Sequence, residues 1–466
     1  MNKNTMKQLS FNIKTFGCQM NERDSEIMAQ LLAEKGYVES IDIEDSDVVI
    51  LNTCSIRAKA EQKAMSLLGA LRKAKKRRPG MKICVAGCVA QQEGEELCER
   101  MPHVDLVIGT QNIYELTELL EATRGTSKVA ISMSDAYEIP AFIPVLPKLL
   151  QGKELPPPFP ARPFRKFLTI MQGCNNYCTY CVVPYTRGRE ISRKVEDIIN
   201  EAHVLVDAGI HEITLLGQNV NSYGRTNPVT TDGSEYSFSL LLREVAAIPG
   251  LKRLRFTTSN PKDLSPELMR CFNEIEILCP QFHLPVQSGS NAVLSKMNRK
   301  YTRELYLQRV EELRSFRPDI ALSTDVIVGF PGETDANFEQ TMELLEHVRF
   351  HSSFSFKYSD RPGTRSADFD DKVDELVKSQ RLARFQKRQD EICLEQNSLY
   401  VGKNLPVMIE KVTEDGMVGR TETNHIVHIE EKIECLPGDI VHIAINHAGQ
   451  HSLNGGISST PATYNK

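Results

Sequence analysis

What this sequence lacks argues against several classes of protein. No apolar run approaches the roughly 20 residues that a membrane-spanning helix requires, so we expect no membrane segment. The first residues lack the apolar core of a signal peptide, which predicts a cytoplasmic protein in which disulfides are rare. Neither sign of charge dominates, since 56 basic and 61 acidic residues leave a net charge of −5. A chain of 466 residues, 41% of them hydrophobic, is instead typical of a globular protein with roughly three domains.

The charge that is present is unevenly distributed. Residues 72–82 hold seven basic residues and no acidic one, and residues 151–194 hold eight basic residues and two acidic ones. This segregation favours an anionic partner on one face of the protein. A solvated helix face together with a charged linker is the alternative interpretation.

Strand and helix patterns alternate through residues 8–133, which predicts a parallel sheet covered by helices on both faces. A proline-rich linker follows at 134–163. Residues 164–390 hold six further strand–helix units, typical of a partial (β/α)6 barrel with its chemistry at the carboxyl ends of the strands. Short strands separated by turns then predict a small β-barrel at 391–458, before a tail at 459–466. The predicted fold class is therefore α/β, with strands at residues 11–17, 47–53, 82–88, 105–109, 128–132, 167–171, 211–217, 251–258, 281–287, 319–329, 351–359, 405–412, 417–421, 425–430 and 439–446.

Three of the twelve cysteines form a compact motif. Cys174, Cys178 and Cys181 lie in GCNNYCTYC, with the spacing C-x3-C-x2-C, directly after the first strand of the central region. Three thiolates on one short loop can hold one metal centre. A structural zinc site would need a fourth protein ligand, and no fourth Cys or His is close in the sequence. Three ligands with one open position instead suit a [4Fe–4S] cluster whose remaining iron binds a substrate.

This motif, with Tyr180 before its last cysteine and six βα units around it, resembles the radical S-adenosylmethionine (SAM) enzymes. In that family the open iron binds SAM, and one electron cleaves SAM to a 5′-deoxyadenosyl radical. The resemblance implies that SAM lies at the carboxyl ends of the central strands, whereas ordinary turn chemistry is the alternative for the glycines there. Besides Tyr180, the residues expected to contact SAM are Gly217, Gln218, Asn219, Ser259, Asn260, Gln287, Ser288 and Gly329.

A second set of cysteines is spread over the first region. Cys18, Cys54 and Cys88 each follow a predicted strand in successive strand–helix units. Because the carboxyl ends of parallel strands share one edge of a sheet, these residues can converge there. Spacing alone leaves open that they are buried core cysteines. The remaining six are expected to be packing residues: Cys84, Cys98, Cys271, Cys279, Cys393 and Cys435.

The segments TFGCQMNERDSE, NTCSIRAKAEQK and GCVAQQEG resemble the N-terminal domain of methylthiotransferases. The resemblance implies that Cys18, Cys54 and Cys88 hold an auxiliary [4Fe–4S] cluster that serves sulfur insertion. The implied cofactors are then two [4Fe–4S] clusters and SAM, with no catalytic side chain assigned beyond the cluster ligands. The final barrel resembles a TRAM RNA-binding module.

Three further segments resemble the branch of this family that acts on tRNA: NNYCTYCVVPYTRGRE, LLGQNVNSYG and HLPVQSGSNAVLSKMNRKYTRE. The resemblance implies an enzyme that methylthiolates C2 of N6-dimethylallyladenosine next to the anticodon. The adenine C2–H bond is unactivated for polar chemistry, which is consistent with a cofactor-derived radical. The expected partners are a tRNA anticodon stem-loop and an electron donor such as a flavodoxin or ferredoxin, and the chain is expected to be monomeric.

The residues expected to contact RNA follow the cysteine loop, follow the second strand of the central region or lie in the last barrel. Tyr185 and Tyr223 are candidates for stacking on splayed-out bases, with core packing as the alternative. His425 stands where the resemblance predicts a lysine or arginine, which predicts weaker or mildly pH-dependent RNA affinity. Four basic residues are expected to meet the SAM carboxylate or RNA phosphates, with a solvated face as the alternative: Arg187, Arg189, Arg193 and Lys194.

Two other functions stay open at this point. The same chemistry can be directed at a threonylcarbamoyl-adenosine tRNA or at an aspartate of a ribosomal protein, although PYTRGRE and GQNVNSYG argue against both. The non-catalytic alternative is an iron–sulfur RNA-binding protein that senses redox state.

Overall fold

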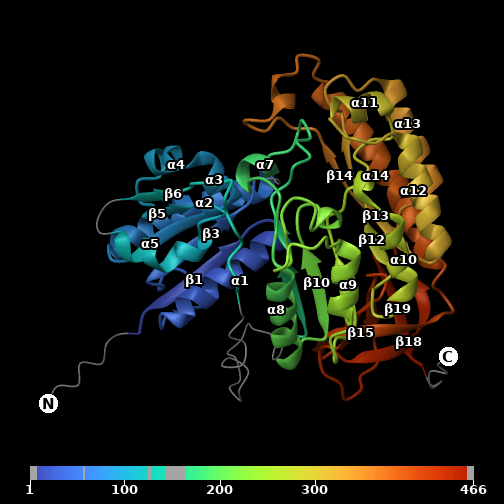
Figure 1. Cartoon of the computed structure of the whole chain (residues 1–466), viewed down its shortest axis with the longest axis horizontal. Helices are drawn as coiled ribbons and strands as arrows, with labels where there is room; N and C mark the ends of the chain where they lie inside the picture. Colours follow the sequence, from blue (N-terminus) through green and yellow to red (C-terminus); the bar gives the residue numbers. More distant parts are fainter. Residues whose placement is uncertain (1–7, 56–57, 124–126, 143–162, 459–466) are drawn as a thin grey trace. The chain divides into compact units, whose positions relative to one another are not determined.

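The computed structural model describes residues 8–55, 58–123, 127–142 and 163–458, which form two compact units (Figure 1). Of the described residues, the first unit comprises those up to 142 together with 171–175 and 182–193. The second comprises residues 163–170, 176–181 and 194–458. Most of the predicted proline-rich linker and the whole predicted tail lie outside the described residues. In the described part of the chain, no helix has the length and hydropathy needed to cross a membrane.

A six-stranded parallel sheet with the order β2-β1-β3-β4-β5-β6 forms the centre of the first unit. Val48 and Ile50 of β3 pack in the core beneath α1 and α5, and Val49 and Leu51 pack in the core beneath α2, α3 and α4. Helices therefore cover both faces, which explains why β3 is apolar throughout. The elements are β1 Ser10–Thr15, α1 Gln19–Glu34, β2 Val38–Glu39, β3 Val48–Thr53, α2 Ala58–Arg77, β4 Lys82–Gly87, α3 Cys88–Glu93, α4 Glu95–Arg100, β5 Leu106–Ile108, η1 Ile113–Glu115, α5 Leu116–Ala122 and β6 Lys128–Ala130.

The first unit also includes a hairpin-like segment from the middle of the chain. β8 (Met171–Gln172) pairs antiparallel with β9 (Ile191–Ser192), and α7 (Val183–Thr186) lies between them in the sequence. Gly173 has a φ of +79°, and a Cβ there would collide with the Arg189 carbonyl oxygen. Only glycine allows this close approach of the two backbones. The strand–helix pattern did not predict that this segment belongs to the first unit.

Six parallel strands form the core of the second unit, in two sheets with the orders β11-β10-β7 and β12-β13-β14. A parallel bridge between Leu254 and Leu278 joins β11 to the segment that leads into β12. The strands thus follow one another in chain order, as expected for a partial barrel. The elements are β7 Arg165–Thr169, α8 Val195–Asp207, β10 Glu212–Leu216, η2 Val220–Ser222, α9 Phe238–Ala246, β11 Arg253–Phe256, η3 Pro261–Asp263, α10 Pro266–Glu274, β12 Gln281–His283, α11 Asn291–Lys296, α12 Arg303–Phe316, β13 Ala321–Val328, α13 Asp335–Val348, β14 Ser352–Lys357, η4 Arg365–Asp368 and α14 Glu375–Ser398.

The second unit ends in a closed barrel with the strand order β15-β16-β17-β19-β18. Four strands were predicted, and β19 was missed because its glycines do not form an alternating pattern. A Cβ on Gly455 would lie 2.5 Å from the Ala444 carbonyl oxygen, so glycine lets β19 pair closely with β18. The strands are β15 Asn404–Thr413, β16 Gly416–Thr421, β17 Ile426–Ile429, β18 Ile440–Ala448 and β19 Ser452–Ile457.

The predicted fold class is confirmed by the parallel sheet of the first unit, the six-stranded core and the terminal barrel. Two local differences stand out. The short edge strand β2 was not predicted, and α1 begins five residues earlier than expected. Cys18 has an extended backbone and is the residue from which that helix starts.

Candidate functional site

Cys18, Cys54 and Cys88 lie at the ends of three neighbouring strands. β1, β3 and β4 are adjacent and parallel, and one of these cysteines follows each of them. Cys54 and Cys88 are buried, Cys18 is partly buried, and Cys18 and Cys54 share a hydrogen bond. The structure therefore brings these side chains to one edge of the sheet, as the sequence predicted.

Two glycines make room for this arrangement. Gly17 has a φ of +136°, and a Cβ there would lie 2.5 Å from the Cys54 Cβ and 3.1 Å from its Sγ. Gly87 has a φ of +91°, and a Cβ there would collide with the Asn52 side chain and the Thr53 carbonyl. Larger residues would strain the backbone and displace the loops that present the cysteines.

A pair of buried amides holds the same edge and was missed in the sequence. Asn21 Nδ2 donates to Asn52 Oδ1 at 2.9 Å and to the Thr53 carbonyl at 2.8 Å. Asn52 Nδ2 donates to the Asn21 carbonyl at 2.8 Å and to Ser25 Oγ at 2.9 Å. Cys18 Sγ lies 3.4 Å from Asn21 Oδ1, so this network also contacts a cysteine. The signal for it was an asparagine at the end of the otherwise apolar strand VVILNT.

Charge is present beside these cysteines as well. Arg187 Nη2 donates to Asp24 Oδ2 at 2.7 Å, with both side chains buried. The hydrogen bond with Cys54 is the main cause that lowers the pKa of Cys18 to about 5, with Arg187 contributing. Burial raises the pKa of Cys88, and Arg187 opposes that rise. The edge of the sheet thus combines thiols with one buried cation.

Three thiols at one edge of a sheet fit the ligand chemistry of an iron–sulfur cluster. Within the described ranges, no group of three or more His, Cys, Asp or Glu side chains is spaced to hold one ion. A four-iron cluster has a different requirement, because each thiolate binds its own iron atom. No disulfide consumes a ligand, since all twelve cysteines of the described chain are thiols.

Cys174, Cys178 and Cys181 lie in the loop between β8 and α7. Both ends of this loop belong to the first unit, and residues 176–181 belong to the second. Cys174 is buried in the first unit, and its backbone N–H donates to the Gly188 carbonyl at 3.2 Å. Cys178 and Cys181 belong to the second unit, where the Cys181 N–H donates to the Cys178 carbonyl at 3.0 Å. Tyr177 has a φ of +47°, an uncommon backbone conformation within this loop.

Side-chain and backbone hydrogen bonds support the second-unit part of this loop. Arg299 Nη1 donates to Cys178 Sγ at 3.3 Å. The Thr179 N–H donates to the Met297 carbonyl at 3.0 Å, which fixes the loop against α11. Tyr180 is partly buried and packs edge-on against Phe330, with ring centroids 6.4 Å apart.

The residues predicted to contact SAM follow the strands of the second unit. Gly217, Gln218 and Asn219 come after β10, and Gly329 comes after β13. Their side chains and backbones also stabilise the loops: Asn219 Nδ2 donates to Asp263 Oδ2 at 2.9 Å, and the Gly329 N–H donates to Glu333. The others that follow strand ends are Ser259 and Asn260 after β11, and Gln287 and Ser288 after β12.

Two of these residues retain buried polar atoms without a hydrogen-bond partner in the described chain, Asn219 Oδ1 and Ser259 Oγ. Gln287 has a φ of +68°, a strained conformation for a non-glycine residue. Unsatisfied polar atoms and strain concentrated at strand ends are typical of a ligand site.

The four basic residues after the cysteine loop differ in exposure. Arg187 and Arg193 are buried, whereas Arg189 and Lys194 are exposed. The buried pair cannot present its charge to an RNA backbone at the surface. Of the two tyrosines proposed for stacking, Tyr185 is 47% exposed and Tyr223 is buried in the core.

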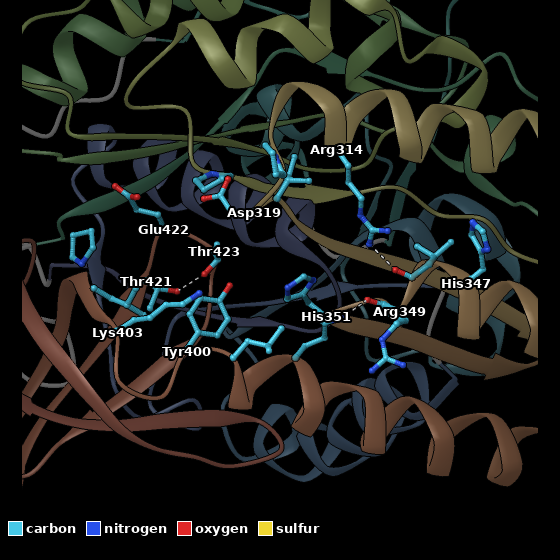
Figure 2. A pocket seen from close by; sticks show the side chains of 18 residues that line it. Arg314, Asp319, His347, Arg349, His351, Tyr400, Lys403, Thr421, Glu422 and Thr423 are labelled. Carbon is cyan, nitrogen blue, oxygen red and sulfur yellow. Dashed lines mark hydrogen bonds between the residues drawn. The ribbon is translucent and has the colours of Figure 1, made fainter. Parts of the chain in front are cut away.

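A cavity of about 440 Å³ lies in the second unit, where the barrel meets the amino ends of β13 and β14 (Figure 2). His351 and Tyr400 line it, and His425 packs against both, with ring centroids 5.8 Å and 4.8 Å away. The cavity is therefore at the strand ends opposite those expected to bind SAM. Burial lowers the pKa of His425 to about 4, so this histidine is neutral near pH 7. A histidine with this pKa does not titrate near pH 7, which argues against mildly pH-dependent RNA affinity there, and the weaker affinity stays a prediction.

Residues 168–345 match the radical SAM superfamily, and residues 10–109 match the uncharacterized protein family UPF0004. Together with the six parallel strands and the C-x3-C-x2-C loop, these matches define a radical SAM protein. Proteins of this class use a [4Fe–4S] cluster and SAM.

The chain belongs to the tRNA-2-methylthio-N(6)-dimethylallyladenosine synthase family. A relative of that name from Desulfotalea psychrophila is 61% identical over 453 residues, covering 97% of this chain and 99% of the relative. A relative of the same name from Syntrophobacter fumaroxidans is 47% identical and covers 96% of each chain.

Solved structures share the fold at low sequence identity. A radical SAM methyltransferase, TsrM from Kitasatospora setae, with tryptophan substrate and a SAM analogue bound, has a TM-score of 0.55 and 15% identity, covering 78% of this chain and 75% of its own. The cobalamin-dependent radical enzyme OxsB with aqua-cobalamin bound has a TM-score of 0.51 and 13% identity, covering 81% of this chain and 56% of its own. These similarities show the fold alone.

Proposed function

We propose that this protein is a tRNA methylthiotransferase that modifies C2 of N6-dimethylallyladenosine next to the anticodon. The observation that carries the proposal is the second cysteine set, at the ends of β1, β3 and β4, in a chain that also has the radical SAM loop. A radical SAM protein that only generates a radical needs one cluster, whereas sulfur insertion needs a sulfur source as well. The near full-length identity to relatives named for this product supports the same substrate.

The proposed cofactors are SAM and two [4Fe–4S] clusters. Cys174, Cys178 and Cys181 hold the first cluster, and the set at the edge of the first sheet holds the second. When bound, these groups supply the radical, the sulfur and the methyl group, while the protein orients and shields them.

The described side chains have distinct tasks in this proposal. Asn21 and Asn52 fix the strand ends that carry the auxiliary ligands. Arg299 donates to Cys178, and the unsatisfied Asn219 Oδ1 and Ser259 Oγ are polar groups for SAM. Because adenine C2–H is apolar and unactivated, the remaining task of the protein is to exclude water and to hold the base near the radical source.

For RNA, the proposal assigns the terminal barrel as a TRAM module and the exposed residues near the loop as contacts. Arg189 and Lys194 are the exposed cations, and Tyr185 is the exposed ring. We assign residues 8–133 to the methylthiotransferase domain, 164–390 to the radical SAM domain and 391–458 to the barrel. We further propose that the protein is a cytoplasmic monomer that receives electrons from a flavodoxin or ferredoxin.

The direct test is an anaerobic assay with reconstituted protein, SAM, dithionite and a synthetic anticodon stem-loop containing N6-dimethylallyladenosine. The expected result is the mass gain of one methylthio group on that base, with cleavage of SAM. Cys174→Ala combined with Cys178→Ala should abolish both, and an RNA with unmodified adenosine should not react. Retained RNA-dependent function in that double variant would instead favour the redox-sensing alternative.

A parallel reaction with threonylcarbamoyl-adenosine RNA tests the other methylthiotransferase activity. We expect the prenylated RNA to react preferentially when both are present at equal concentration. Modification of the threonylcarbamoyl RNA alone would contradict the proposed substrate but retain the proposed chemistry.

A further inference from the structure

Arg187 is buried in the first unit with only part of its guanidinium satisfied. Its Nη2 donates to Asp24 Oδ2 at 2.7 Å, and the two side chains are 3% and 7% exposed. Its Nη1 is also buried and makes no hydrogen bond of good geometry within the described chain. A guanidinium is always charged and carries five N–H donors, so an unsatisfied terminal nitrogen in the interior is costly. This nitrogen can donate to a bound group, because the described residues supply no acceptor for it.

The groups beside this guanidinium are the cysteines of the first unit. The charge of Arg187 acts on the thiols of both Cys88 and Cys18, which places its guanidinium beside these two cysteines. Thiolates and the sulfides of an iron–sulfur cluster are acceptors for N–H donors, and such hydrogen bonds tune the reduction potential. The unsatisfied nitrogen and the cysteine ligands therefore belong to one site.

Two hydrogen bonds position Arg187, one on its guanidinium and one on the backbone of the preceding residue. Asp24 lies on α1, the helix that begins directly after Cys18. On the other side, the carbonyl of Thr186, the residue before Arg187, accepts a 2.6 Å hydrogen bond from Thr110 Oγ1. A buried ion pair contributes little net stability because both charges lose their hydration. Stability alone therefore gives a weak reason for placing Arg187 there.

We propose that Arg187 is the counter-ion and N–H donor of the cluster bound by Cys18, Cys54 and Cys88, with Asp24 as its positioning residue. The inference rests on the proposed function, because it requires the auxiliary cluster. A positive charge beside a cluster stabilises the added electron and raises the reduction potential, whereas the negative charge of Asp24 lowers it. The two residues therefore affect the cluster with opposite signs.

The experiment uses the full chain with Cys174, Cys178 and Cys181 replaced by alanine, so that only the auxiliary cluster remains. Iron and sulfide content and the reduction potential, followed by electron paramagnetic resonance, are measured in this parent and its variants. We expect about four irons per chain in the parent. Arg187→Met should shift the potential to more negative values, Asp24→Asn should shift it to more positive values, and Arg187→Lys should stay near the parent.

Two further variants separate this role from a structural one. Asp24→Asn combined with Arg187→Met avoids leaving one buried charge unpaired, and its potential should lie between those of the single variants. Arg23→Met is the matched control. Arg23 is a buried arginine on α1, the helix of Asp24, and its guanidinium lies over the Phe142 ring and pairs with Glu26. The potential of Arg23→Met should equal that of the parent.

The outcomes are distinguishable. If the parent binds no iron, the proposal of an auxiliary cluster is wrong, and so is the proposed role of Arg187. If the parent holds about four irons, two results overturn the role of Arg187 and leave the cluster intact. One is a reduction potential in Arg187→Met equal to that of the parent. The other is a shift of the potential in the same direction in Arg187→Met and in Asp24→Asn. If Arg187→Met does not retain iron, the sign of the shift in Asp24→Asn decides, and a negative shift or none overturns the proposal.

Discussion

Arg299 Nη1 donates a hydrogen bond to Cys178 Sγ across 3.3 Å. The rest of the guanidinium is held by the protein, with Nε donating to Tyr301 Oη at 2.9 Å and Nη2 to the Pro285 carbonyl at 3.2 Å. A partly buried cation thus accompanies a cysteine of the radical SAM loop, as the buried Arg187 accompanies the cysteines of the first unit. Cations at both sets compensate the negative charge that thiolate ligands bring into the interior.

Replacing Arg299 by methionine should therefore weaken the radical SAM loop. We expect a loss of about 1–3 kcal/mol in the free energy of unfolding of the iron-free protein, because the Tyr301 hydroxyl and the Pro285 carbonyl lose a charged donor. Urea unfolding followed by circular dichroism measures this change. The neighbouring Lys300→Met is the control, since Lys300 is exposed and its amine donates to the nearby Asn298 side chain. Equal stability of both variants would contradict the prediction.

Gly17→Ala should remove the auxiliary cluster while leaving the radical SAM cluster in place. The added Cβ would lie 2.5 Å from the Cys54 Cβ and displace a proposed ligand. Iron content of the reconstituted protein should fall from about eight to about four atoms per chain. Gly36→Ala is a matched control, because Gly36 also has a positive φ but an added Cβ meets nothing within 4 Å. A full iron complement in Gly17→Ala would contradict the prediction.

Arg255 connects the central sheet to the terminal barrel within the second unit. Its Nε lies 3.1 Å from Glu212 Oε2, and its terminal nitrogens donate to the carbonyls of Glu422 and Thr421 at 2.8 and 2.9 Å. Arg255→Met should cost about 3–5 kcal/mol, because it leaves the Glu212 carboxylate buried and unpaired. Adding Glu212→Gln should recover part of that loss, which a double-mutant cycle on urea unfolding measures. Strict additivity would show that the pair is not coupled.

The histidines beside the cavity predict a loss of stability in acid. Burial lowers the pKa of His351 to about 3 and that of His425 to about 4, from 6.5 in the unfolded chain. Neighbouring charges act in the same direction, from Arg314 and His425 on His351 and from Arg420 on His425. The unfolded state therefore binds more protons, and stability is lost as the pH falls from about 6.5 towards 4.

Each histidine contributes up to about 1.4 kcal/mol per pH unit in that window. His351→Gln combined with His425→Gln should flatten the dependence of the unfolding free energy on pH between 6.5 and 4.5. His447→Gln is the control, because His447 is exposed on β18. An unchanged pH slope in the double variant would contradict the assignment.

The sequence predicted what depends on local order along the chain. Cys18, Cys54 and Cys88 follow strands, and the topology of parallel sheets then places them on one edge. The same rule placed the residues expected to contact SAM after β10, β11, β12 and β13. The pattern was clearest for β3 and β4, which are almost entirely buried and read as nearly continuous apolar runs.

What the sequence did not predict depends on partners far away in the chain. Arg187 was expected at an RNA or SAM surface, yet its partner Asp24 lies 163 positions earlier. The pairing of Asn21 with Asn52 spans 31 positions. No periodicity encodes such contacts, because they depend on which loops the completed sheet brings together.

The segment between β8 and β9 has a consequence for dividing this protein into pieces. A fragment that ends at residue 142 retains the three cysteines of the first sheet but loses Thr186 and Arg187, which pack in the same unit. Such a fragment would carry Asp24 as an uncompensated buried charge. The N-terminal third of this chain is therefore not a self-contained domain. Fusing it to another radical enzyme would require residues 171–175 and 182–193 as well.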